Sequence, residues 1–322
     1  MRSKKDWMSL KTRLGQLFIA PYNGREVNGE IVTLINHYRI GGIFLTKEAL
    51  QKEKQITTMT EKLQQYATVE HPLIISIDQN TLETALPTLP SIKEFRQGTN
   101  RLFVEQFAEA TGQSLRELGI NTIFYPSIDI DGNFPGRETL EHYKKFGTHL
   151  VKGLQKSDVV ACLVNYPNKE QIDLHLRSDR KSSNVYPFYE ILQKEAEMLQ
   201  ISTYSAPDIN LYIRKHLSYD GLIVYDLRKE HDKTTITASF IRELLEAGVD
   251  LFLLPEGFNR QLNLLNELFE MINTIKEDII NKSFKKVTHL KTTYHFSLLE
   301  QQKKLTPYQQ ERLINRVKNS LT

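Results

Sequence analysis

The chain has 322 residues, of which 40% are hydrophobic and 25% charged, and this composition is that of an ordinary globular protein rather than a disordered one. Its 42 basic and 39 acidic residues give a formal net charge of +3 and are spread along the chain, so charge gives no reason to expect a nucleic acid partner. No apolar run reaches the length of a membrane span, and we expect no membrane partner.

The basic opening of the chain is not followed by the apolar stretch that a signal peptide needs, because Lys11 and Arg13 interrupt it. The single cysteine, Cys162, lies in an apolar run typical of a buried strand and cannot form an intrachain disulfide. Both observations favour a reducing, cytoplasmic location, although a secreted protein without disulfides would have the same composition.

Short apolar runs alternate with stretches of helical period along the chain, a pattern typical of a parallel sheet wrapped by helices. Each run is apolar through its centre, as expected for strands that are covered on both faces. In chain order, the predicted strands are 16–20, 42–46, 73–78, 121–129, 159–166, 201–206, 221–226 and 250–255.

The stretches between these runs have the features of helices. Segment 101–118 places Phe107, Ala110 and Leu115 on an inner face at a period close to 3.6 residues. Eight strand–helix units without a break in composition predict an α/β protein with a single (β/α)8 barrel of the TIM type over residues 1–296. Residues 297–322 are predicted to form a helical appendage or tail.

Polar side chains at the strand ends are the first candidates for chemistry, because TIM barrels hold their reactive groups there. Asp78, Asp129 and Asp226 end the third, fourth and seventh predicted strands, and Asp173 and His175 follow the fifth. One such acid is often only a helix cap, and a histidine there is often a solvated loop residue. For Asp129 we favour a structural role as an anchor for the loop after the fourth strand. Several on one rim, however, supply the two carboxyl groups, or the carboxylate and separate proton donor, that hydrolysis of a glycosidic bond requires.

The order of several short segments points to one family. These segments are 14–18, 38–43, 75–79, 118–129, 219–226, 247–251 and a late helix at 281–294. No single one is decisive, but their order along the chain resembles the N-terminal catalytic domain of glycoside hydrolase family 3, and bacterial β-N-acetylglucosaminidases in particular. The resemblance covers roughly residues 10–296.

The resemblance implies a retaining β-glycosidase of the β-N-acetylglucosaminidase type that acts on a small carbohydrate or a cell-wall fragment, as in cell-wall recycling. Asp226 matches the nucleophile that forms a covalent glycosyl-enzyme, and Asp173 and His175 match an Asp-x-His acid/base pair in which the carboxylate orients the imidazole. Asp78 matches a residue that binds sugar hydroxyls. Arg137 lies near the place of a sugar-binding arginine, with a surface arginine as the alternative. No metal or organic cofactor is implied.

The sequence departs from the family pattern around the expected sugar site. Asn80 to Glu83 replace a glutamate, paired glycines and an arginine, Val164 and Asn165 stand in place of a lysine and a histidine, and Leu227 and Arg228 follow Asp226 in place of a second acid. Donors aimed at sugar hydroxyls contribute about 1 to 3 kcal/mol each, so these changes would alter the substrate or abolish activity. A non-catalytic sugar-binding or regulatory descendant of the family is therefore the alternative hypothesis. An unrelated barrel enzyme is a third, against which the ordered segments count.

Overall fold

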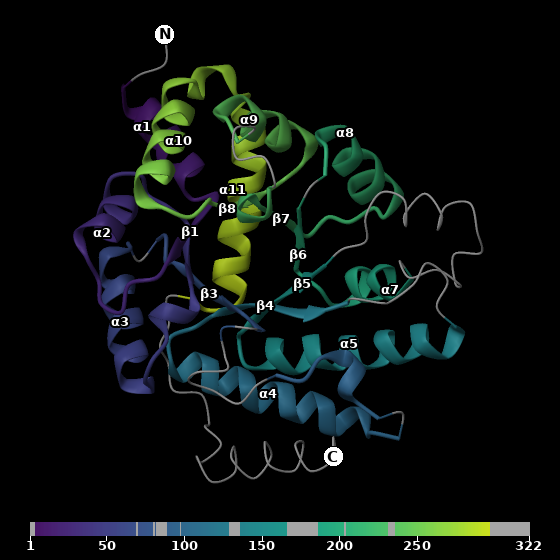
Figure 1. Cartoon of the computed structure of the whole chain (residues 1–322). Helices are drawn as coiled ribbons and strands as arrows, with labels where there is room; N and C mark the ends of the chain where they lie inside the picture. The colour runs from purple at the N-terminus through teal and green to yellow at the C-terminus, as the bar shows by residue number, and fades with distance from the viewer. Residues whose placement is uncertain are drawn as a thin grey trace.

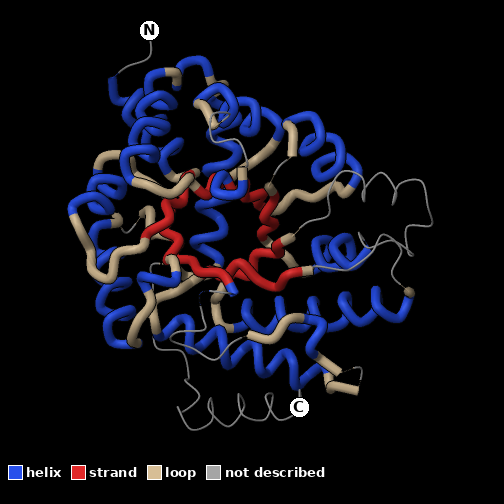
Figure 2. The backbone as a smooth tube through the Cα atoms, in the orientation of Figure 1, coloured by secondary structure: helices blue, strands red, loops and turns tan. Residues whose placement is uncertain are grey.

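The computed structural model describes residues 4–68, 70–79, 81, 89–96, 98–128, 136–165, 186–202, 204–230 and 236–296. Within these residues, eight strands pair in chain order, each parallel to its neighbours, and close into a barrel (Figures 1 and 2). The predicted (β/α)8 barrel is thus confirmed. The strands are Phe18–Tyr22 (β1), Gly42–Leu45 (β2), Ile74–Asp78 (β3), Thr122–Ser127 (β4), Val160–Val164 (β5), Met198–Ile201 (β6), Leu222–Asp226 (β7) and Leu251–Leu253 (β8).

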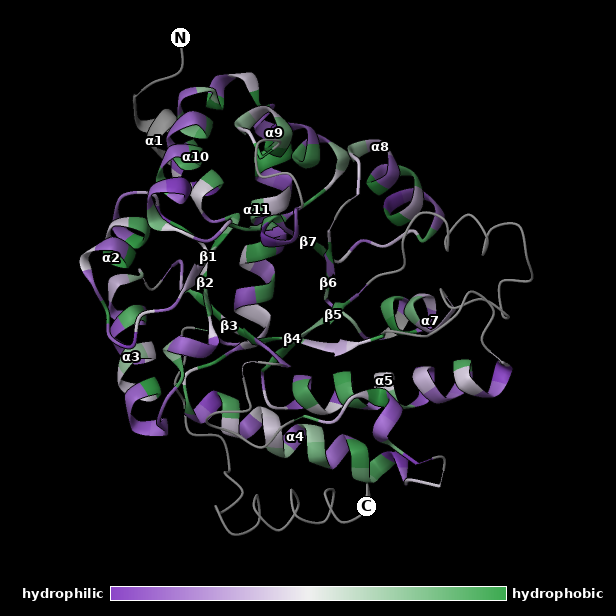
Figure 3. Cartoon of the chain, viewed as in Figure 1, coloured by the Kyte–Doolittle hydropathy of each residue, from purple (hydrophilic) through white to green (hydrophobic). Residues whose placement is uncertain are grey.

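Helices surround the ring of strands (Figure 1). Figure 3 shows that the strands carry mainly hydrophobic residues, whereas the helices present both hydrophobic and hydrophilic ones. No helix in the described ranges is long and apolar enough to span a lipid bilayer. The α-helices are Lys4–Gly15 (α1), Gly29–Asn36 (α2), Glu53–Tyr66 (α3), Arg101–Glu117 (α4), Arg137–Lys156 (α5), Tyr186–Lys194 (α7), Ala206–Asp208 (α8), Ala238–Ala247 (α9), Phe258–Glu270 (α10) and Glu277–Thr293 (α11). Shorter helices are Lys47–Ala49 (η1), Ile92–Glu94 (η3), Leu227–Lys229 (η6), Ile272–Thr274 (η7) and the π-helix Ile209–His216 (η5).

Helix α4 illustrates how local sequence sets the elements. The side chain of Asn100 accepts a hydrogen bond from the backbone nitrogen of Leu102 and so caps the first turn. Phe107, Ala110 and Leu115 are buried, which confirms the predicted inner face. The strands are buried as well, and Cys162 of β5 is fully inaccessible, as its apolar neighbours predict.

The first two family-like segments meet at the start of β1 and β2. The backbone nitrogen of Gly41 donates to the carbonyl oxygen of Phe18 over 2.9 Å. A Cβ atom at Gly41 would lie 1.9 Å from the backbone oxygen of Gln16, a distance that no side chain tolerates. Glycine at this position therefore permits the close approach of two backbone segments, and this part of the motif has a structural role.

The sixth predicted strand is wrong in position. The predicted run 201–206 overlaps the observed strand, Met198–Ile201, only at its last residue, whereas the other seven predicted runs overlap their strands more extensively. The side chain of Ser205 instead caps helix α8. The true strand was not recognised in the sequence because the polar residue Gln200 interrupts its apolar pattern.

Helix α11 covers the N-terminal end of the barrel, and it is visible through the ring of strands in Figure 2. Its buried Lys291 donates to the side-chain oxygen of Gln16 at 2.8 Å and to the backbone oxygen of Gly41 at 2.9 Å. Both acceptors are uncharged, so the ammonium group loses solvation without gaining an anionic partner. Burial accordingly lowers the pKa of Lys291 to about 7.

Replacing Lys291 with methionine should remove a pH dependence of folding stability. In the unfolded chain the lysine stays protonated up to its ordinary pKa of about 10.5, whereas in the folded protein it loses the proton near 7. The burial penalty is therefore fully present below pH 7, and wild-type stability rises by a few kcal/mol as the pH increases from about 7 to 10.5.

Urea unfolding at several pH values across this window measures the effect. The free energy of unfolding of wild type minus that of Lys291→Met should rise with pH. Lys285→Met, at an exposed position of the same helix, is the matched control and should follow wild type. Parallel pH profiles for wild type and Lys291→Met would contradict the assignment.

Candidate active site

A cavity of about 430 Å³ lies at the C-terminal ends of strands β3 to β7, which is the end where TIM barrels carry their reactive groups. Most of its lining comes from the last residues of these strands or the segments that follow them. The lining residues are Asp78, Gln79, Ser91, Ile92, Lys93, Phe124, Ser127, Tyr143, Val164, Asn165, Gln200, Arg228 and Lys229.

Asp226 is the last residue of β7, and its carboxylate is fully buried. One oxygen, Oδ1, accepts from the backbone nitrogen of Arg228 at 3.1 Å and from its Nε at 3.0 Å. The other, Oδ2, accepts from Nη2 of Arg228 at 3.0 Å and from Nε2 of Gln200 at 2.6 Å. Asp226 therefore has the helix-capping role of an ordinary strand-end acid, for η6, but it is also a buried anion that four donors hold in one orientation.

Arg228 lies between this carboxylate and the cavity. Its side chain lines the cavity and is 18% exposed, whereas the carboxylate of Asp226 is 0% exposed and is not part of the lining. The guanidinium carbon also lies 4.1 Å from the ring centroid of Phe44 on β2, within the range of a cation–π contact. The fork to the carboxylate and the aromatic contact together fix Arg228 as a wall of the site.

Gln200 and Phe44 were not predicted as site residues. Gln200 lies in β6 and aligns with Val224 of β7, so its amide reaches Asp226 from the neighbouring strand. A polar residue within an apolar strand is the signal that could have identified it, but Gln200 lies one residue before the predicted sixth strand, 201–206. Arg228 was noted as a departure from the family pattern, without its contact to Asp226.

Other polar groups face the same cavity. Asp78 ends β3, and its Oδ1 accepts from the backbone nitrogen of Thr81 at 3.0 Å, which fixes the side chain at the rim. Asn165, after β5, donates from Nδ2 to the hydroxyl of Ser127 at 2.7 Å. Carboxylate, amide and hydroxyl groups spaced around one cavity are well suited to hydrogen-bond sugar hydroxyls.

The remaining predicted site residues either do not line this cavity or lie outside the described residues. Arg137 is the first residue of α5, is exposed, and does not belong to the cavity lining described above. Asp173 and His175 lie outside the described residues, as do Asp129 and the predicted appendage 297–322. The structure therefore brings Asp78 to the cavity and Asp226 directly behind its wall, and the chemical roles of all five predicted site residues stay predictions.

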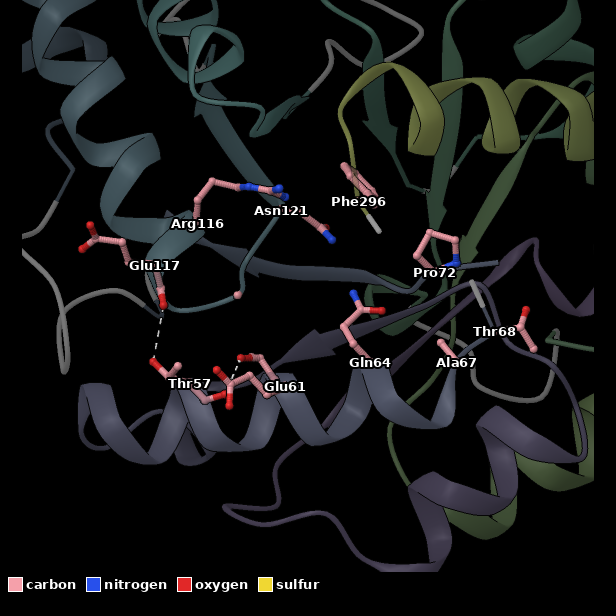
Figure 4. Close-up of a pocket in the computed structure, with 12 residues that line it drawn as sticks. Thr57, Glu61, Gln64, Ala67, Thr68, Pro72, Arg116, Glu117, Asn121 and Phe296 are labelled. Atoms are coloured by element: carbon pink, nitrogen blue, oxygen red, sulfur yellow. Dashed lines mark hydrogen bonds between the residues drawn. The ribbon is translucent and has the colours of Figure 1, made fainter. Parts of the chain in front are cut away.

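A second, smaller cavity of about 170 Å³ lies near the N-terminal ends of β3 and β4 (Figure 4). Figure 4 shows Gln64 of α3 on one side and Arg116, Asn121 and Phe296 on the other. The side-chain nitrogens of Gln64 and Asn121 both donate to the backbone oxygen of Leu73 at 2.9 Å. These polar groups hold the barrel end together, and we assign no chemistry to this cavity.

The chain is similar to bacterial β-hexosaminidases. It is 25% identical over 336 residues to beta-hexosaminidase A of Pseudoalteromonas piscicida, which covers 82% of this chain and 55% of that protein. It is 22% identical over 286 residues to the beta-hexosaminidase of Haemophilus influenzae, which covers 76% of this chain and 81% of that one. This chain therefore spans just over half the length of the first relative.

The fold is also similar to that of a solved glycoside hydrolase family 3 beta-N-acetylglucosaminidase from a Paenibacillus species. The TM-score is 0.80 at 24% identity, over 97% of this chain and 68% of that one. The family described as Glycosyl hydrolase family 3 N terminal domain matches residues 9–290, and the chain belongs to this family.

Proposed function

We propose that the protein is a retaining β-glycosidase that hydrolyses β-N-acetylglucosaminide-type bonds through a covalent glycosyl-enzyme. The observation that carries the proposal is the buried Asp226 carboxylate at the C-terminal end of β7, held behind a polar cavity in a family 3 barrel. Relatives named as beta-hexosaminidases support the choice of sugar. A cell-wall fragment as substrate and a cytoplasmic location belong to the same proposal.

In this proposal, Asp226 attacks the anomeric carbon once a glycoside occupies the cavity. The bond from that carbon to the leaving oxygen breaks as the bond to the carboxylate forms, and His175 protonates the leaving oxygen. The neutral imidazole then takes a proton from water, which displaces Asp226 and regenerates the acid. Asp173 orients His175, while Asp78 and Arg137 bind sugar hydroxyls.

Gln200 has a positioning role in the same scheme. Its amide holds one oxygen of Asp226 from the neighbouring strand and so keeps the carboxylate oriented. Such preorganisation lowers the barrier because the nucleophile does not have to reorient when charge develops.

Hydrolysis of 4-nitrophenyl β-N-acetylglucosaminide by the wild-type chain tests the proposal. Proton NMR of the product at early times should show the β-anomer first, as double displacement requires. An initial α-anomer would exclude the covalent route. Sugars that raise the melting temperature while no β-glycoside is turned over would instead favour the non-catalytic alternative.

His175→Ala should lower kcat/KM, which reports formation of the glycosyl-enzyme, by about 10²-fold to 10⁴-fold for a substrate with a poor leaving group, such as a methyl or phenyl β-N-acetylglucosaminide. The loss should be much smaller for a 2,4-dinitrophenyl leaving group, which departs without protonation. Steady-state rates on the two substrates measure the difference. His289→Ala, exposed on α11 at the opposite end of the barrel, is the control and should match wild type. Equal losses on both substrates would contradict an acid role.

A further inference from the structure

The cavity at the C-terminal end of the barrel is lined mainly by positive charge. Among its described lining residues, Lys93, Arg228 and Lys229 are cationic, and Asp78 is the acid. They come from the segments that follow β3 and β7, on different sides of the cavity. Asp226 balances Arg228 from behind the lining, so the described lining keeps a small excess of positive charge, which favours anionic ligands over neutral ones.

The ion pair between Arg228 and Asp226 is a second reason to expect an anionic ligand. The guanidinium of Arg228 holds both oxygens of Asp226 at 3.0 Å and separates the carboxylate from the cavity. This fork has to open before Asp226 contacts an anomeric carbon, and the free energy that this opening costs depends on the substrate. A neutral sugar provides no anion to replace Asp226, so the guanidinium would lose its partner within a partly buried site, which is unfavourable.

We infer that the cavity selects a glycoside that carries an anionic substituent, a carboxylate or a phosphate, and that Arg228 is the specificity-determining residue. Arg228 exchanges the carboxylate of Asp226 for the anionic group of the substrate, with Lys93 and Lys229 adding attraction, and this exchange uncovers Asp226 for attack. The inference rests on the proposed function for the use of Asp226. The selective binding that it requires does not depend on turnover.

Isothermal titration calorimetry on the wild-type chain compares N-acetylglucosamine with two acidic counterparts, N-acetylmuramic acid, which carries a carboxylate, and N-acetylglucosamine 6-phosphate. At low salt, at least one acidic sugar should bind about tenfold more tightly than the neutral one, and the preference should shrink as added salt screens the charges. Whichever acidic sugar shows the preference identifies the anionic group.

Variants assign the preference to Arg228. Arg228→Gln should reduce the ratio of acidic to neutral affinity to within about threefold of unity, because the fork and its charge are both lost. Lys229→Gln removes a cavity cation outside the group that holds Asp226, and should reduce the ratio partially even if Arg228→Gln fails to fold. Lys62→Gln, an exposed charge change on α3, is the matched control and should keep the wild-type ratio.

Equal affinity for neutral and acidic sugars in the wild type overturns the inference, as does the absence of binding by both acidic sugars up to about 10 mM. An unchanged ratio in Arg228→Gln overturns the role of that residue. Selective binding of acidic sugars without hydrolysis of any glycoside would contradict the proposed function and support the inference. Hydrolysis of neutral and acidic glycosides with equal efficiency would support the proposed function and overturn the inference.

Discussion

Asp226→Ala is expected to lower kcat for an aryl β-N-acetylglucosaminide by roughly 10³-fold or more, because it removes the proposed nucleophile. In the described part of the site, the neighbouring acid is Asp78, which its contact with Thr81 holds at the rim of β3. Steady-state rates on the 4-nitrophenyl substrate measure the loss. Activity that survives the substitution would end the assignment of Asp226.

The same substitution disturbs the structure, and the two effects have to be separated. Arg228 and Gln200 would lose their shared acceptor, and breaking a buried ion pair on one side typically costs about 3 to 5 kcal/mol. Added azide distinguishes the effects, because it can attack the anomeric carbon in place of the missing carboxylate. Faster release of nitrophenol with an α-glycosyl azide as product is expected from a folded variant that lacks only its nucleophile.

Asp250→Ala is expected to lower the free energy of unfolding by about 3 to 5 kcal/mol. The buried carboxylate accepts a short hydrogen bond from Arg214, one from Ser283 at 2.9 Å and one from the backbone nitrogen of Ile223 at 3.1 Å. Lys286 approaches it at 3.5 Å. The substitution thus leaves two cations and a backbone donor without their anion, at the point where α11 meets β7 and β8.

Urea unfolding measures this loss, and Asp220→Ala is the matched control, since Asp220 is an exposed acid at the same end of the barrel. Because Asp250 lies at the opposite end from the cavity, kcat of the folded variant should equal that of wild type. A loss below about 1 kcal/mol would show that the network contributes little.

Much of the fold follows from sequence because parallel strands covered on both faces are apolar throughout, and eight such runs separated by helical segments leave few other arrangements. The sixth strand was misplaced because its one polar residue, Gln200, points to Asp226 rather than to the hydrophobic core. The exception to the apolar pattern is thus a residue of the candidate site. Functional sites commonly place a polar side chain where the fold alone would favour an apolar one.

The site itself was only partly predictable. The positions of Asp78 and Asp226 follow from their places at strand ends, since the topology brings those ends to one face. The contact of Arg228 with Asp226 and Phe44 depends on side-chain conformation and on β2 approaching the end of β7 in space, and spacing along the chain carries no such information. The roles of Asp173 and His175 still rest on the resemblance.

The bonds from Lys291 to Gln16 and Gly41 join the last described helix of the barrel to the starts of its first two strands, and they span 275 and 250 positions of the sequence. Strand β1 likewise pairs with β8, where Ile19 aligns with Leu253. During synthesis, β1 can pair with β2 early, whereas its other neighbour, β8, leaves the ribosome more than 200 residues later. One edge of β1 therefore stays open until β8 has been made, and closure of the barrel is a late, long-range step of folding.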